Sequence, residues 1–310
     1  MPSILLRYAN EMVQTRKLGG SFRSFAWEGG GDRLIVVGDG GQILTIEGEK
    51  AVKLVSGTHQ NLRGISINPT DGTALIAGNA GTVLLLRRED LSARRLDAPT
   101  SENLRAASWN PRGTSALISG NQGALLRYSS QRLELLGAAR ANLRHIAWSS
   151  ASGKALVTSN CFAEEFIPSP NLFAYDPANQ TLSSLNEGRS DLIGVDWKAD
   201  GTIALVVGYD VIWHNGEIAV FDGVNLSHVE FNNKRVYPVA VSWKPSEELA
   251  TIVTSTPQPG MGKGVVYLWD RKSLRTIYSN DLVFFSAVAW NKDGTELAAL
   301  GSSMSRTFNC

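Results

Sequence analysis

A chain of 310 residues with 43% hydrophobic and 19% charged residues holds enough apolar material for a buried core, which excludes a disordered chain. No run approaches the roughly 18 to 20 apolar residues of a membrane helix. The two cysteines, Cys161 and Cys310, do not resemble a disulfide framework. We therefore expect a cytoplasmic, intracellular protein without a membrane segment.

The formal net charge of +1 hides an asymmetry between the two halves of the chain. Residues 1–155 carry 19 Lys/Arg against 12 Asp/Glu, whereas residues 156–310 carry 11 against 17. Arginine makes up 20 of the 30 basic residues. Since arginine is suited to bidentate recognition of carboxylate or phosphate, this bias indicates either an anion-binding role or ordinary surface charge.

The chain opens with two strand patterns, Ile4–Tyr8 and Val13–Leu18, of which the first resembles Leu125–Tyr128 further along the sequence. They match a third and a fourth strand of a four-stranded unit. The last strand patterns, Val283–Trp290 and Leu297–Gly301, match a first and a second strand. We predict that the strands at the two ends pair to complete one unit.

Between these ends one position recurs at intervals of 39 to 49 residues. Its occupants are Trp27, Ile67, Trp109, Trp148, Trp197, Trp243 and Trp290. Counted from Trp290 to the C-terminus and on from the N-terminus to Trp27, the interval is 47 residues. It matches the other intervals, so the repeat closes on itself. A period of this length is typical of stacked supersecondary units.

The second unit shows what each repeat contains. Four short strand patterns, Leu62–Ile67, Ala74–Ala77, Val83–Leu86 and Ala93–Leu96, are separated by turn residues such as Asn68–Gly72. Four-stranded units with this spacing are propeller blades. The sequence thus predicts an all-β, seven-bladed β-propeller with four-stranded antiparallel blades, one domain over residues 1–310 in which residues 1–18 complete the blade begun by 283–301.

The innermost strand of each unit alternates between a bulky and a small face. Small residues stand one and three positions before the recurring slot, as in Ser66 and Gly64, whereas the residue two before it is usually bulky. Neighbouring sheets come closest near the ring axis, so a bulky face there can only pack against a small one. His145 is the exception to this pattern.

The chain resembles WD40-type propellers along its whole length. The resemblance rests on Trp269-Asp270, on Tyr175-Asp176 and Phe221-Asp222, and on the strand-plus-turn patterns Trp197–Gly201 and Trp290–Gly294. The Gly-His pair of that family is absent, so we predict a divergent WD40-like propeller. The glycine-rich turns Gly38–Gly41, Gly78–Gly81 and Gly120–Gly123 are similar to those in propellers of photosystem assembly factors.

Four consecutive units carry arginine four residues before the recurring slot: Arg23, Arg63, Arg105 and Arg144. By the resemblance, this position lies on the top face, near the mouth of the central channel. Four arginines there would form an arc that focuses positive potential on an anionic group. The structural alternative is that each arginine caps carbonyl groups of a neighbouring blade.

Units four to six have longer links between their second and third strands, spanning 159–170, 208–216 and 254–263. Aromatic and apolar residues in these links are candidate binding residues: Phe162, Phe166, Tyr209, Trp213 and Met261. Alternatively, they fold over the blades as lids.

The predicted top face is basic on one half and aromatic and acidic on the other. Such a face suits a protein or peptide partner with an anionic group better than nucleic acid. The leading hypothesis is a non-catalytic protein-binding scaffold without a cofactor. The four histidines lie in four different repeats without metal-ligand spacing. The alternatives are a propeller-type small-molecule hydrolase or lactonase with its site at the channel mouth, and a binder of an anionic polymer such as RNA.

Overall fold

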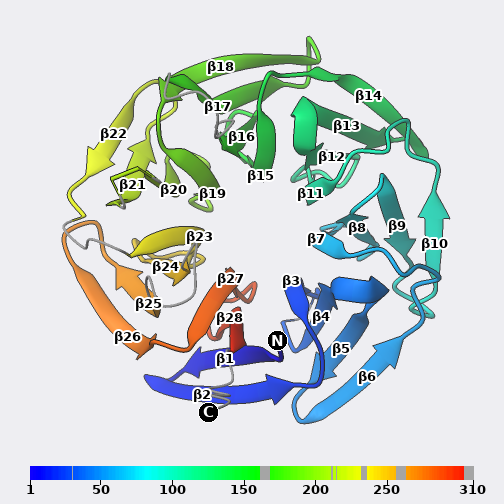
Figure 1. Ribbon diagram of the computed structural model, residues 1–310, viewed down its shortest axis with the longest axis horizontal. Helices are drawn as coiled ribbons and strands as arrows, with labels where there is room; N and C mark the ends of the chain where they lie inside the picture. Colours follow the sequence, from blue (N-terminus) through cyan, green and yellow to red (C-terminus); the bar gives the residue numbers. More distant parts are fainter. Residues whose placement is uncertain are drawn as a thin grey trace, which may run out of the picture.

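The computed structural model describes residues 1–29, 31–160, 168–210, 212–213, 215–231, 236–255 and 263–303, except for the side chain of Ala138. These residues form seven four-stranded antiparallel sheets arranged as blades around a central axis (Figure 1). The prediction of an all-β, seven-bladed propeller is confirmed. Within the described part of the chain, no helix has the length and apolar character needed to cross a membrane.

Each blade runs from an inner strand at the axis to an outer strand at the rim. Blade 1 contains β3 (Phe22–Trp27), β4 (Arg33–Gly38), β5 (Ile43–Glu47) and β6 (Lys50–Leu54). Blade 2 contains β7 (Leu62–Ile67), β8 (Ala74–Gly78), β9 (Thr82–Leu86) and β10 (Ala93–Leu96). Blade 3 contains β11 (Leu104–Trp109), β12 (Ser115–Gly120), β13 (Ala124–Ser129) and β14 (Arg132–Ala138). The short 3-10 turns η1 (Asp39–Gly41) and η2 (Asn121–Gly123) link the second and third strands of blades 1 and 3.

The remaining blades follow the same order. Blade 4 contains β15 (Asn142–Trp148), β16 (Ala155–Asn160), β17 (Ser169–Asp176) and β18 (Thr181–Gly188). Blade 5 contains β19 (Asp191–Trp197), β20 (Ala204–Asp210), β21 (Asn215–Phe221) and β22 (Leu226–Val229). Blade 6 contains β23 (Tyr237–Trp243), β24 (Ala250–Ser255), β25 (Gly264–Trp269) and β26 (Leu274–Asn280).

Blade 7 joins the two ends of the chain. Its inner strands are β27 (Val283–Trp290) and β28 (Leu297–Ser303), and its outer strands are β1 (Ser3–Ala9) and β2 (Met12–Leu18). Strand β1 pairs antiparallel with β28 from Ser3 opposite Ser302 to Tyr8 opposite Leu297. The ring is therefore closed by strands from both ends, as the sequence predicts.

The apolar core lies between blades, not inside one central cluster. Seven clusters of buried side chains are found in the described residues, and each joins two adjacent blades. At the junction of blades 3 and 4, for example, Leu117 and Leu125 pack with Leu143, Val157 and Tyr175. Each blade is thus held by the apolar area it shares with two neighbours.

Small residues on the inner strands make this close approach possible. A Cβ on Gly64 would lie 2.6 Å from the Cα of Ala106, and one on Gly194 would lie 2.9 Å from the carbonyl oxygen of Val239. Both distances are far below van der Waals contact. The inner strands of adjacent blades therefore meet where the sequence alternates between a bulky and a small face.

Candidate functional site

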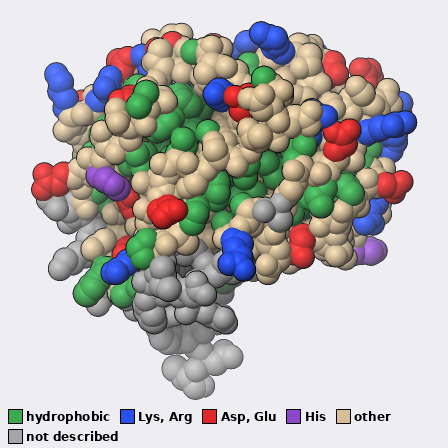
Figure 2. Space-filling view, turned by 90° about the horizontal axis from the view of Figure 1, so that it is seen from above, with side chains coloured by type: hydrophobic (Ala, Val, Ile, Leu, Met, Phe, Trp, Pro, Cys, Tyr) green, Lys and Arg blue, Asp and Glu red, His purple; other side chains and the backbone are tan. Residues whose placement is uncertain are grey.

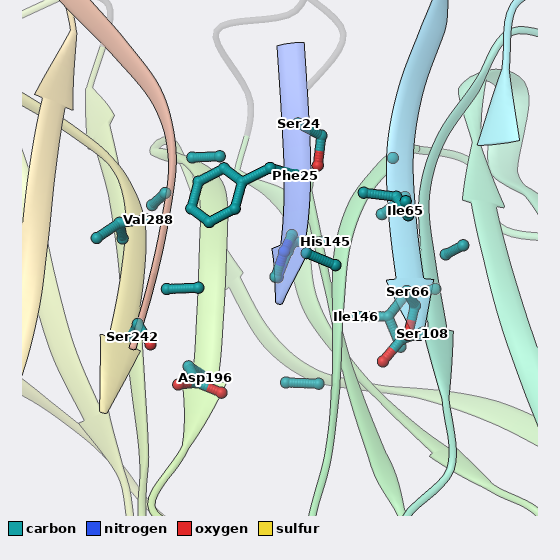
Figure 3. Close-up of a pocket in the computed structure, with 18 of the residues that line it drawn as sticks. Ser24, Phe25, Ile65, Ser66, Ser108, His145, Ile146, Asp196, Ser242 and Val288 are labelled. Atoms are coloured by element: carbon teal, nitrogen blue, oxygen red, sulfur yellow. The ribbon is translucent and has the colours of Figure 1, made fainter. Parts of the chain in front are cut away.

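The seven inner strands surround a central cavity of about 650 Å³. Figure 3 shows side chains from several of these strands pointing into it. Ser66, Ser108, Asp196 and Ser242 gather toward one end, Ser24 lies toward the other, and His145 lies between them. The cavity therefore has a polar wall made by residues far apart in the sequence.

Asp196 replaces a serine in a repeated contact between blades. The hydroxyls of Ser66 and Ser242 accept hydrogen bonds from the backbone N–H groups of Trp109 and Trp290, at 3.1 and 3.2 Å. In the same place, Oδ2 of Asp196 accepts from the N–H of Trp243 at 2.8 Å. Burial raises the pKa of Asp196 to about 7, although hydrogen bonds from two backbone N–H groups oppose the shift.

His145 stands where the other blades carry a small residue. Its Nδ1 lies 3.1 Å from the carbonyl oxygen of Val195, so Nδ1–H is the donor and Nε2 carries the lone pair. Burial lowers the pKa of His145. In the part of the chain that the structure describes, no hydrogen bond links this ring to Asp196 or to a serine hydroxyl. Nor do three His, Cys, Asp or Glu residues among those described gather closely enough to hold a metal ion.

The four predicted arginines share one local geometry. Each donates its Nε–H to an aspartate or asparagine 16 residues later, at the start of the turn after the second strand. The pairs and their distances are Arg23 with Asp39 (3.1 Å), Arg63 with Asn79 (3.3 Å), Arg105 with Asn121 (3.0 Å) and Arg144 with Asn160 (2.7 Å). Arg23, Arg63 and Arg105 line the central cavity.

Blades 2 to 4 hold their arginine through a repeated Asn-Leu-Arg sequence. The asparagine side chains of Asn61, Asn103 and Asn142 accept hydrogen bonds from the turn backbone of the preceding blade at 2.9 to 3.1 Å. The leucines that follow, Leu62, Leu104 and Leu143, are fully buried. The asparagine thus joins two blades, the leucine fills the core, and the arginine is positioned by both.

Charge compensation differs along this arginine arc, defined as Arg23, Arg63, Arg105 and Arg144. Asp39 accepts from Arg23 and also lies 3.4 Å from Nη1 of Arg63. The hydrogen bond from Arg23 lowers the pKa of Asp39. In blades 3 and 4, asparagine stands in place of this aspartate, so Arg105 and Arg144 each have a neutral partner.

Arg105 is the least compensated member of the arc. Burial and, to a smaller extent, the positive charges of Arg144 and Arg63 lower its pKa to about 10. Burial also lowers the pKa of Arg144, while Asp191 and Tyr209 oppose that shift. Among the described residues, no ion pair involves Arg105 or Arg144. Among the described residues, Arg105 therefore has no counter-charge, whereas the negative charge of Asp191 partly compensates Arg144 without an ion pair.

The predicted loop residues are placed in part. Tyr209 occupies in blade 5 the position that Asn160 holds in blade 4, and its ring packs edge-on against Tyr237 with centroids 5.4 Å apart. Trp213 is 66% exposed and lies beside Ile212, which is 40% exposed. Phe162, Phe166 and Met261 lie outside the described residues. The arc therefore ends next to Tyr209, with exposed apolar side chains in the same inter-strand link.

The rim of the ring is different in character. Figure 2 views the ring edge-on and shows acidic and basic side chains interspersed, with hydrophobic side chains between them. The arginine arc gathers charge of one sign instead.

Sequence reasoning missed the partners of the arginines. The turns were identified from the sequence but were not paired with the arginines. The signal was the constant spacing of 16 residues between each arginine and the aspartate or asparagine in the following turn. It also missed the exchange of Asp39 for asparagine in later blades, which decides where the charge stays uncompensated. Asp196 stands one residue before the recurring position, where most units carry a small residue, and sequence reasoning did not single it out.

Comparison with known proteins shows the fold and no more. No family model matches the chain, and no curated protein matches it. Among solved structures, a protein from Agrobacterium tumefaciens described as a candidate TolB is similar, with a TM-score of 0.61 and 14% identity. The match covers 98% of this chain and 99% of that one. The chain shares its β-propeller fold. The finer resemblances to WD40-type propellers and to photosystem assembly factors stay predictions.

Proposed function

We propose that this protein is a non-catalytic scaffold that binds an acidic peptide segment of a partner protein across the mouth of its central channel. One observation carries the proposal. Arg105 and Arg144 are partly buried, lie close enough to lower the pKa of Arg105, and are held through Nε by neutral asparagines. Within the part of the chain that the structure describes, their terminal guanidinium nitrogens donate no hydrogen bond and can bind a carboxylate.

The peptide is favoured over nucleic acid by what lies beside the arginines. Tyr209 offers aromatic surface close to Arg144, and Ile212 and Trp213 are exposed in the inter-strand link that follows Tyr209. Exposed aromatic side chains on a rigid scaffold are frequent anchors in protein interfaces. A segment with acidic side chains next to an apolar one would match both parts of the surface.

The test is a titration of the purified protein with a short fluorescein-labelled peptide of glutamate and leucine, followed by fluorescence anisotropy. We expect the Arg105→Ala/Arg144→Ala variant to bind about 100-fold more weakly or worse, because it loses two charge-assisted hydrogen bonds that contribute about 1.5–3 kcal/mol each. Arg95→Ala, on the exposed outer strand β10, is the matched control and should bind like the wild type.

A single-stranded RNA of matched charge, titrated under the same conditions, separates the two classes of ligand. We expect the RNA to bind more weakly than the peptide and with a steeper dependence on salt. Equal affinity of the wild type and the double variant for the peptide, or a clear preference for RNA, would contradict the proposal.

A further inference from the structure

A second polar cavity lies between blades 3 and 4, at the end of the strands opposite to the arginine arc. Its volume is about 470 Å³, and its wall includes the turns after the first strand of each blade, at Asn110–Ser115 and Ser149–Gly153. Arg105 lies near the start of β11 and these turns follow its end. The cavity is therefore separate from the arginine arc, although Asn110, Pro111 and Trp148 line both this cavity and the central one.

The cavity wall is rich in hydrogen-bond donors. It contains Arg112, Arg127 and the hydroxyl of Tyr175, together with serine and threonine hydroxyls, and none of its described lining residues is an aspartate or glutamate. Thr114 and Ser115 each accept a hydrogen bond from the amide of Asn110 at 3.0 Å, which leaves their hydroxyl protons free to donate. A wall of this kind favours an anionic ligand.

Two buried polar groups in this wall make no well-formed hydrogen bond among the described residues. Tyr175 is 1% exposed, and its hydroxyl has at most a weak hydrogen bond with the side chain of Arg127. Nε of Arg127 is likewise poorly paired, whereas Nη2 of the same side chain pairs with Glu134 at 2.6 Å. Burial raises the pKa of Tyr175, and the positive charge of Arg127 and this weak hydrogen bond act in the opposite direction. Leaving buried polar groups poorly paired is costly, so a ligand that pairs them would gain affinity.

Two other blade junctions carry different residues or a different charge balance at the position of Arg127. At the junction of blades 2 and 3, Leu85 takes the strand position of Arg127, and the cavity wall includes Asp71 and Glu89. At the junction of blades 7 and 1, Arg7 takes this position but pairs with Glu296 at 2.6 Å. Blade 3 has Ser115 at the place that corresponds to Glu296.

We propose that the cavity between blades 3 and 4 binds a phosphate group, carried by a free phosphate ion or by a small phosphate ester. The number of donors favours phosphate over carboxylate. Arg127, Tyr175, Thr114, Ser115 and Arg112 offer more N–H and O–H groups than the two oxygens of one carboxylate can use. The oxygens of a phosphate group can accept from all of them.

The test is isothermal titration calorimetry with inorganic phosphate, glycerol phosphate and acetate at matched ionic strength. The starting protein carries Arg105→Ala and Arg144→Ala, so that only the two arginines of the arc that pair with Asp39 remain. Tyr175→Phe removes only the hydroxyl, and Phe221 shows that phenylalanine fits this strand position in blade 5. Arg127→Leu introduces the residue type that blade 2 carries at the corresponding position, Leu85. Tyr128→Phe, at the same position in blade 3, is the matched control.

We expect phosphate binding that Tyr128→Phe leaves unchanged and that Tyr175→Phe and Arg127→Leu each weaken about tenfold or more. Tighter binding of glycerol phosphate would identify an ester as the ligand, and equal or weaker binding would identify the free ion. Equal binding of acetate, the same affinity in all variants, or no phosphate binding beyond the effect of salt would overturn the proposal.

Discussion

At the scale of single residues, one exchange decides the character of the channel mouth. Asp39 compensates Arg23 and Arg63, whereas Asn121 and Asn160 hold Arg105 and Arg144 without adding charge. The positions of the four arginines could be predicted from the repeat. Their partial burial and their partners could not, because these depend on how the turns of adjacent blades meet in space.

Asp196 gives a residue-scale prediction for stability against pH. Its folded pKa of about 7 lies above the ordinary value of 3.8, so the native state binds more protons than the unfolded state between these values. We expect the contribution of Asp196 to the free energy of unfolding to fall as pH rises from about 4 to about 7 and then to level off.

The variant Asp196→Ser should lose this part of the pH dependence while keeping the hydrogen bond to Trp243, as Ser66 and Ser242 make it in other blades. Urea unfolding of both proteins across this pH range measures the difference. A wild type whose stability relative to the variant stays constant over the range would contradict the assignment.

At the scale of elements, strand positions follow closely from the sequence. The predicted strand Leu62–Ile67 matches β7, and Val283–Trp290 matches β27. Period-two alternation and turn residues were sufficient here because every inner strand packs a bulky face against a small one. The cavity between blades 3 and 4 could not be predicted in this way, since Arg127 and Tyr175 lie on different blades and meet only in the ring.

The small face of the inner strands yields an element-scale prediction. We expect Gly64→Ala to lower the free energy of unfolding by about 1–3 kcal/mol, because the new Cβ would overlap the backbone of Ala106 and push β7 away from β11. Gly19→Ala is the control: its Cβ would meet nothing within 4 Å, so a change within about 0.5 kcal/mol is expected. Equal unfolding midpoints for the two variants in urea would show that the inner strands are not closely packed.

At the scale of the whole molecule, ring closure brings distant residues together. Two of the seven apolar clusters contain side chains from β1, and both also include residues of β27 or β28. Closure was predictable because a partial repeat at one end of the sequence complements a partial repeat at the other.

Deleting residues 1–18 should therefore destabilise the whole ring and not only its last blade. The deletion removes β1 and β2, exposes the edge of β28 and opens the core on both sides of blade 7. We expect a lower and less cooperative melting transition by circular dichroism, with partial recovery when a peptide of residues 1–18 is added. A deletion variant that melts like the parent would contradict the closure.

The central functional claim is that Arg105 and Arg144 serve a ligand and not the fold. Its most direct test is thermal unfolding of the wild type and of Arg105→Ala/Arg144→Ala, each with and without the acidic peptide. A ligand at 100 times its dissociation constant stabilises the native state by about 2.7 kcal/mol. We predict similar melting temperatures for the two free proteins and a peptide-induced rise of a few degrees in the wild type alone. A free double variant that melts far below the wild type, or a peptide-induced rise of the same size in both proteins, would contradict the claim.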